Sequence, residues 1–84
     1  MPVVASFNGI TIEMYPKEHP PSHFHARYAE HIAQIAIQPF KVMNGSLPIP
    51  QLKRVQIWAS TRQPQLLDCW RAIEEGRKPE KIND

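Results

Sequence analysis

The sequence predicts an α+β fold, with an antiparallel β-sheet of four to five strands in the N-terminal half and two C-terminal α-helices packed on one face. Three observations favour this fold. Within the strands expected between residues 2 and 43, apolar and polar residues mostly alternate with the period of two that is typical of strands. After Pro48 the apolar period lengthens to about 3.6 residues, as in amphipathic helices. Prolines and Asn-Gly pairs separate the apolar segments, where turns are expected.

The first two strands are expected to form a hairpin. Residues 3–7 and 10–15 flank Asn8-Gly9, a pair that suits a type I′ turn because both of its central residues need positive φ. Two faces alternate along the second strand, with Ile10, Ile12 and Met14 on one and Thr11, Glu13 and Tyr15 on the other. A proline-rich loop over residues 16–22 ends this strand.

A second pair of strands is expected over residues 23–28 and 31–38, joined by a tight turn at Ala29-Glu30. The first of them places Phe24, Ala26 and Tyr28 on one side and His23, His25 and Arg27 on the other. The second directs Ala33, Ile35 and Ile37 inward, and leaves Ile32 out of phase. Residues 40–43 are expected to add a short edge strand.

Two helices are expected over residues 50–61 and 64–75. Their apolar stripes are Leu52, Val55, Trp58 and Ala59 in the first helix, and Leu66, Cys69, Trp70 and Ile73 in the second. Gly76 suits the position after the second helix, where a left-handed residue ends many helices. Ile57 lies off the apolar stripe, so we expect it to be exposed or to contact a partner.

Length and composition exclude several classes of protein. A chain of 84 residues predicts one domain, over residues 1–84. Its formal net charge of +2 is too small to indicate nucleic acid or an anionic membrane by itself. The single cysteine excludes an internal disulfide and a zinc site built from cysteines. The sequence has no secretory signal and no apolar run long enough to span a membrane, so a cytoplasmic location with no membrane partner is expected.

A histidine cluster is the main candidate for chemistry. His19, His23 and His25 fall within seven positions, and the last two share one face of a predicted strand. Adjacent imidazoles of this kind can bind a divalent ion such as zinc, with Glu18 or Glu13 as a carboxylate ligand. Three protein ligands and a water molecule are the usual arrangement in catalytic zinc sites.

Two other interpretations of the cluster stay open. In the first, two imidazoles act as metal-free base and acid, Arg27 holds a phosphate, and Tyr15 stacks on a base or donates a hydrogen bond, as in ribonuclease-like transesterification or RNA binding. In the second, the loop is a rigid connection whose imidazoles bond to loop carbonyls or to water. The sequence therefore leaves open whether the protein is an enzyme.

A family resemblance covers nearly the whole chain. The pattern that carries the resemblance is a short strand, then Phe-x-Gly-Ile-x-Ile-x-Met-Tyr, an acidic residue, histidine, prolines and His-Phe-His-Ala-x-Tyr. With this pattern the chain resembles a bacterial family of short proteins, domain-of-unknown-function family four-one-six-zero. The matching positions are Phe7, Gly9, Ile10, Ile12, Met14, Tyr15, Glu18, His19, Pro20, Pro21, His23, Phe24, His25, Ala26, Tyr28, Gly45, Leu47, Pro48, Leu52, Val55, Trp58, Ala59, Leu66, Leu67, Trp70, Pro79, Lys81 and Ile82. Ser22 departs from the pattern, because the family usually has proline there, and this predicts a looser loop.

The resemblance implies a small bacterial cytoplasmic protein whose gene lies beside that of another small protein, as in toxin–antitoxin modules. We therefore expect one half of such a pair, which acts by binding the protein encoded by the adjacent gene, with RNA as a second candidate ligand. A histidine- or metal-dependent phosphodiester hydrolase is the alternative from a different class, and a purely structural interaction module is a third. A carboxylate within reach of the histidines would favour the metal enzyme, and exposed apolar residues would favour partner binding.

Overall fold

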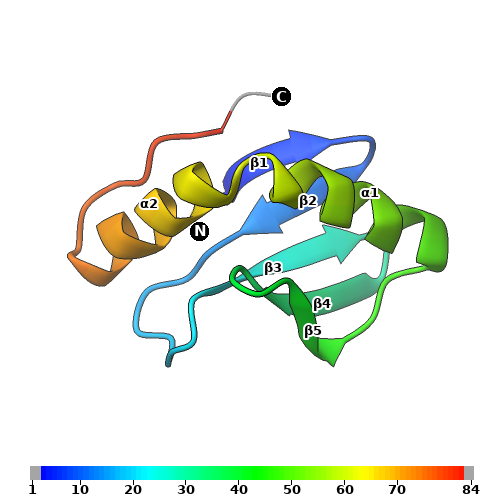
Figure 1. Ribbon diagram of the computed structural model, residues 1–84, viewed down its shortest axis with the longest axis horizontal. Coiled ribbons are helices and arrows are strands. Elements are labelled where there is room, and N and C mark those ends of the chain that lie inside the picture. The colour runs from blue at the N-terminus through cyan, green and yellow to red at the C-terminus, as the bar shows by residue number, and fades with distance from the viewer. Residues whose placement is uncertain (1–2, 83–84) are drawn as a thin grey trace.

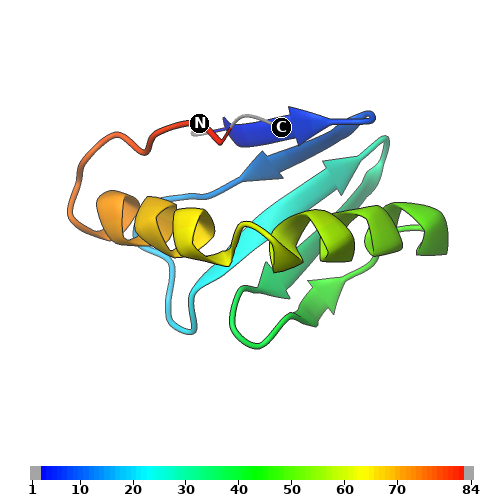
Figure 2. The ribbon, with the colours of Figure 1, turned by 45° about the horizontal axis from the view of Figure 1, so that its top comes forward.

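The computed structural model describes residues 3–82 and contains five strands followed by two helices (Figure 1). The elements are β1 (Val3–Phe7), β2 (Ile10–Glu13), β3 (His23–Tyr28), β4 (His31–Ala36), β5 (Lys41–Gly45), α1 (Ile49–Ser60) and α2 (Gln63–Glu74). The strands form one antiparallel sheet in chain order. The two helices follow one another across the same face of the sheet (Figure 2). The α+β fold predicted from the apolar periods is confirmed.

The hairpin turns explain the antiparallel pairing of the strands, and the alternation of side chains explains which face of the sheet is buried. Asn8 and Gly9 both have positive φ, of 50° and 76°, as the type I′ turn between β1 and β2 requires. Across β2, β3 and β4, the register aligns Ile12 with Ala26 and Ala26 with Ala33. Because paired residues of antiparallel strands point to the same side, these residues form one apolar face under the helices.

The core lies between this apolar face and the two helices. Its largest fully buried side chains come mainly from the sheet and include Phe24, Ile10, Ile12, Met14, Ile35, Leu66, Val4 and Val55. The stripe predicted for α2 is buried throughout, whereas Leu52 at the start of the α1 stripe is only partly buried. The rings of Phe7 and Trp58 stack with centroids 4.9 Å apart and thereby join β1 to α1.

The structure shifts some predicted boundaries. The edge strand β5 covers Lys41–Gly45 instead of residues 40–43. A bulge between Gln34 and Ile35 of β4 displaces the register at this edge, which the alternation of apolar residues did not show. The helices begin and end one residue earlier than predicted, and Gly76 has the expected left-handed conformation, with φ of 75°.

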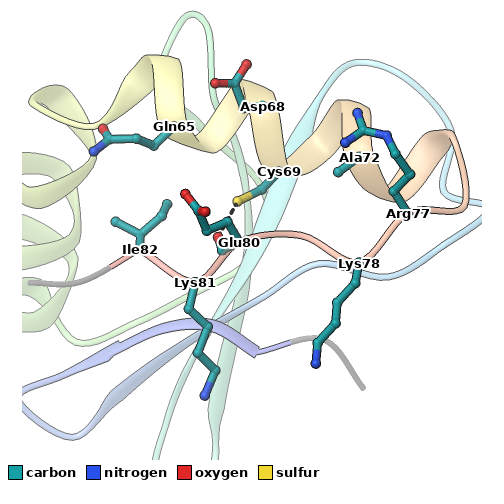
Figure 3. Close-up of a pocket in the computed structure, with 9 residues that line it drawn as sticks. All are labelled: Gln65, Asp68, Cys69, Ala72, Arg77, Lys78, Glu80, Lys81 and Ile82. Atoms are coloured by element: carbon teal, nitrogen blue, oxygen red, sulfur yellow. Dashed lines mark hydrogen bonds between the residues drawn. The ribbon is translucent and has the colours of Figure 1, made fainter.

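The chain after α2 runs back beside Cys69 of α2 and reaches β1. The Ile82 amide donates to the Val4 carbonyl at 2.7 Å, and the Cys69 thiol donates to the Glu80 carbonyl at 3.3 Å. A pocket lies between this tail and α2 (Figure 3), lined by Gln65, Asp68, Cys69, Ala72, Arg77, Lys78, Glu80, Lys81 and Ile82. Burial, together with the nearby charges of Asp68 and Glu80, raises the pKa of the Cys69 thiol. A raised pKa disfavours the reactive thiolate, as is typical of buried structural cysteines.

The helices of the described segment, residues 3–82, are each 12 residues long. Neither is long and apolar enough to cross a membrane.

Candidate metal centre

The polar face of the sheet lies opposite the helices. The register aligns Glu13 with His25, and Thr11 with Arg27, on the neighbouring strands β2 and β3. These residues alternate with the apolar ones on each strand, so their side chains point away from the helices. The predicted common face for His25 and Arg27 follows from this register. The His23 ring lies beside the His25 ring, at 5.6 Å between centroids, but its position at the start of β3 also brings it next to α2.

Three potential ligands converge at the end of this face. The Glu18 Oε1 atom lies 2.5 Å from His25 Nε2 and 3.3 Å from His23 Nε2. One ligand atom from each of the three residues lies within 4.8 Å of the other two. Glu18 comes from the loop after β2, which turns at Lys17 with a left-handed φ of 64°. This turn precedes the glutamate directly and allows its carboxylate to reach both imidazoles.

The backbone fixes the tautomer of His23. Its Nδ1 atom lies 2.8 Å from the Pro21 carbonyl oxygen. Because a carbonyl oxygen can only accept, Nδ1 carries the proton, and in a neutral ring the Nε2 atom then has a lone pair. This lone pair faces the Glu18 carboxylate, which is also an acceptor. A cation between the two atoms, either a proton or a metal ion, satisfies both acceptors.

Aromatic neighbours hold both imidazoles in place. The Trp70 ring of α2 lies 5.0 Å from the His23 ring, between centroids, at the start of β3. The Tyr15 ring meets the His25 ring edge to face at 4.7 Å. The histidine side chains are only 5% and 13% exposed. Packing therefore restricts the rotamers of both rings and pre-organises their nitrogen atoms.

Glu13 takes part in a separate network on the same face. Its Oε1 atom accepts a hydrogen bond of 2.7 Å from the Tyr15 hydroxyl and lies 3.6 Å from the Arg27 guanidinium. The hydrogen bond to Glu13 is the main cause that raises the pKa of Tyr15, so the hydroxyl remains a donor at neutral pH. Of the two carboxylates proposed from the sequence, Glu18 is the one that reaches the histidines.

The comparison with protein families matches residues 9–71 to DUF4160, a domain of unknown function. This match covers well over half of the chain. The chain belongs to the DUF4160 family. The matched segment contains all three convergent residues, Glu18, His23 and His25. Neither the curated proteins nor the solved structures contain a significant match.

In this DUF4160 protein, the remaining predicted site residues lie around the three convergent ones. His19 is exposed on the loop and is not one of the three convergent ligands found in the described part of the chain. Arg27 is partly exposed beside Glu13, and Tyr15 contacts His25. The Ser22 carbonyl accepts a hydrogen bond from the Ile37 amide, so the loop is anchored at the position where proline is missing.

Sequence reasoning missed two parts of the site. Trp70 was assigned to the core alone, yet its ring also contacts His23. The Pro21 carbonyl, which fixes the His23 ring, is a backbone group two residues away. The short sequence distance between Pro21 and His23 was the only available signal for this bond.

The interactions of the Glu18 carboxylate are expected to contribute to the free energy of unfolding at neutral pH, and this contribution is expected to be lost in acid. The hydrogen bond with His25 lowers the pKa of Glu18 below its ordinary value of 4.5. A lowered pKa in the folded state contributes stability that is complete above about pH 4.5 and is lost as the pH falls through the folded value. We therefore expect Glu18→Gln to reduce the unfolding free energy most at neutral pH and least near about pH 3.

Urea unfolding of both proteins in a chelating buffer, from about pH 7 to pH 3, checks this expectation. A difference between wild type and Glu18→Gln that stays constant over this range would contradict it.

Proposed function

We propose that this protein binds a divalent transition-metal ion, with zinc as the first candidate, through Glu18, His23 and His25. One observation carries the proposal. Nδ1 of His23 donates a hydrogen bond to the Pro21 carbonyl, and the lone pair of the neutral ring is therefore on Nε2, which faces the Glu18 carboxylate. Metal-binding histidines commonly have this arrangement, in which the second ring nitrogen donates to a backbone carbonyl. Nitrogen and carboxylate ligands also suit zinc.

The ligand set supports hydrolysis as the reaction class. Three protein ligands leave one position of a tetrahedral ion open for water, and a bound zinc ion lowers the pKa of such a water to about 7. Arg27, with its side chain 42% exposed on the same strand, favours an anionic substrate. We therefore propose a phosphodiester such as RNA as the substrate. Water would form the new P–O bond, the bond to the leaving oxygen would break, and that oxygen would take up a proton.

A zinc titration followed by NMR of the imidazole protons tests the metal site. We expect saturation at one zinc per chain, with large shifts for His23 and His25 and small ones for His19 and His31. His31 is a suitable internal reference because it lies at the start of β4, beside Glu30. If stoichiometric zinc shifts neither His23 nor His25, the metal site is rejected, and the Glu18 contacts serve only to hold the loop.

A second proposed function is partner binding within a toxin–antitoxin-like gene pair. The exposed apolar residues of α1 favour it, because Ile49 and Ile57 are 69% and 70% exposed. The test is co-expression with the product of the adjacent gene, followed by size-exclusion chromatography at micromolar concentration. A joint peak is expected. Separate elution of the two proteins would reject the pair.

A further inference from the structure

A shallow hollow lies along the C-terminal half of α1, beside the turn between β1 and β2. The stacked rings of Phe7 and Trp58 line it, and the other lining residues are Asn8, Arg54, Ile57, Thr61 and Arg62. Ile57 is 70% exposed at this hollow. Single exposed apolar residues are common on protein surfaces, but here one is combined with a concave aromatic base.

The hollow is also basic. The α1 sequence contains Lys53 and Arg54 but no acidic residue, and none of the residues that line the hollow is acidic. Arg62 is held in place, because its Nη1 atom donates to the Trp58 carbonyl and to the Thr61 hydroxyl, and its guanidinium lies 5.5 Å from the Trp58 ring centre. The exposed cations of α1, Lys53 and Arg54, lie one turn before Ile57 and therefore complement carboxylates.

This charge distribution argues against a second copy of the chain. A symmetric contact would bring the same surface patch of two copies together. Lys53 and Arg54 of α1 would then face a patch with the same positive charges and no carboxylate. Like charges across an interface are unfavourable, so the occupant is a different molecule.

The burial of the aromatic rings argues against single-stranded RNA. Proteins that bind single strands stack bases on accessible aromatic faces. Trp58 is only 5% exposed, since its ring packs against Phe7 and lies close to the Arg62 guanidinium. The accessible group is the aliphatic side chain of Ile57, which suits an apolar side chain of a polypeptide.

We propose that this α1 surface, formed by Phe7, Arg54, Ile57, Trp58 and Arg62, binds an acidic segment of a partner protein. One apolar side chain of the segment packs against Ile57 over the hollow, and flanking carboxylates pair with Lys53 and Arg54. This inference rests on the proposed partner binding and names the surface and the chemistry that carry it out.

A synthetic acidic peptide with one central leucine provides the first test. The Trp58 indole N–H, which has no acceptor among residues 3–82, serves as an NMR reporter at the hollow. We expect the peptide to shift the signals of Ile57, Arg54 and this N–H, with binding that weakens as salt is added. Replacing the leucine by alanine, or the glutamates by lysines, is expected to weaken binding about tenfold or more.

Matched variants locate the contact on the protein. Ile57→Ala and Arg54→Glu are each expected to weaken peptide binding about tenfold. Ile32→Ala is the control, because Ile32 is also exposed, at 42%, but lies on the opposite side of the sheet, where it pairs with Arg27. This control should bind like the wild type. Equal binding by all three variants overturns the proposal.

Two further measurements separate the alternatives. If a labelled oligouridine binds this surface and Ile57→Ala leaves its affinity unchanged while Arg54→Glu abolishes it, the occupant is RNA and the proposal is wrong. The same variants are then co-expressed with the adjacent gene product. Co-purification that neither variant weakens rejects the α1 surface and leaves the pair intact. Peptide binding without any co-purification supports the surface and rejects the pair.

Discussion

Replacing His25 by alanine is expected to weaken zinc binding by more than about a hundredfold. Loss of a group that only supports a metal ligand typically costs 10–100-fold in affinity, and the loss of a ligand should cost more. The His25 Nε2 atom makes the closest contact with Glu18, and its removal would leave two of the three proposed ligands, Glu18 and His23. Competition with a chromophoric chelator at neutral pH measures the change.

His19→Ala is the matched control for this prediction. It removes the same side chain from an exposed position in the adjacent loop, where we expect no effect on zinc affinity. An equal loss of affinity in both variants would show that the ligand set includes His19 and would contradict the proposed one. Circular dichroism of each variant verifies that the fold is retained.

An assay of RNA cleavage distinguishes a protein that only binds zinc from one that also hydrolyses RNA. A fluorogenic RNA oligonucleotide is expected to be cleaved by the zinc-loaded wild type and by His19→Ala, but not by His25→Ala. Tight zinc binding without cleavage by the wild type would retain the metal site and reject RNA as the substrate. Cleavage that persists in the presence of a chelator would instead favour the metal-free interpretation of the histidines.

Gly45→Ala is expected to destabilise the fold by about 3 kcal/mol or more. Gly45 has a φ of 73°, and a Cβ atom there would lie 2.1 Å from the carbonyl oxygen of Ile32. This oxygen belongs to the backbone of β4 and also accepts a hydrogen bond from Ser46, so it cannot move without disturbing the pairing with β5. The left-handed conformation adds about 1–2 kcal/mol for alanine.

Gly76→Ala measures how much stability is lost from the left-handed backbone conformation alone, without a steric contact. Gly76 has nearly the same φ, 75°, but an added Cβ atom would meet no other atom of residues 3–82 within 4 Å. We expect this control to lose only about 1 kcal/mol. Urea unfolding of both variants measures the difference. Equal losses would mean that the contact with Ile32 does not decide the stability at Gly45.

The local parts of the fold were predictable because they depend on neighbouring residues. The Asn8-Gly9 turn follows from the backbone preferences of two residue types, and alternation places His23 and His25 on one face. The change of apolar period after Pro48 distinguishes the sheet from the helices. These signals determine which side of a strand a residue faces, and so they predicted that His23 and His25 lie side by side.

The remaining parts depend on contacts between distant segments or on a single backbone angle. The choice of Glu18 over His19 as the residue beside the histidines depends on the left-handed Lys17, and no residue preference predicts that conformation for lysine. The contact of Trp70 with His23 joins α2 to β3 across 47 positions of sequence. Neither is visible in a pattern of apolar residues.

The hydrogen bond between Ile82 and Val4 has a practical consequence for work with fragments. A fragment trimmed to the segment that matches the family, residues 9–71, would omit β1, the last turn of α2 and the tail. Val4, Ile73 and Ile82, all buried core residues, would be lost with them. Such a fragment would expose the edge of β2 and apolar side chains around Cys69, and we expect it to aggregate. We therefore expect the unit that folds to extend beyond the segment that matches the family at both ends.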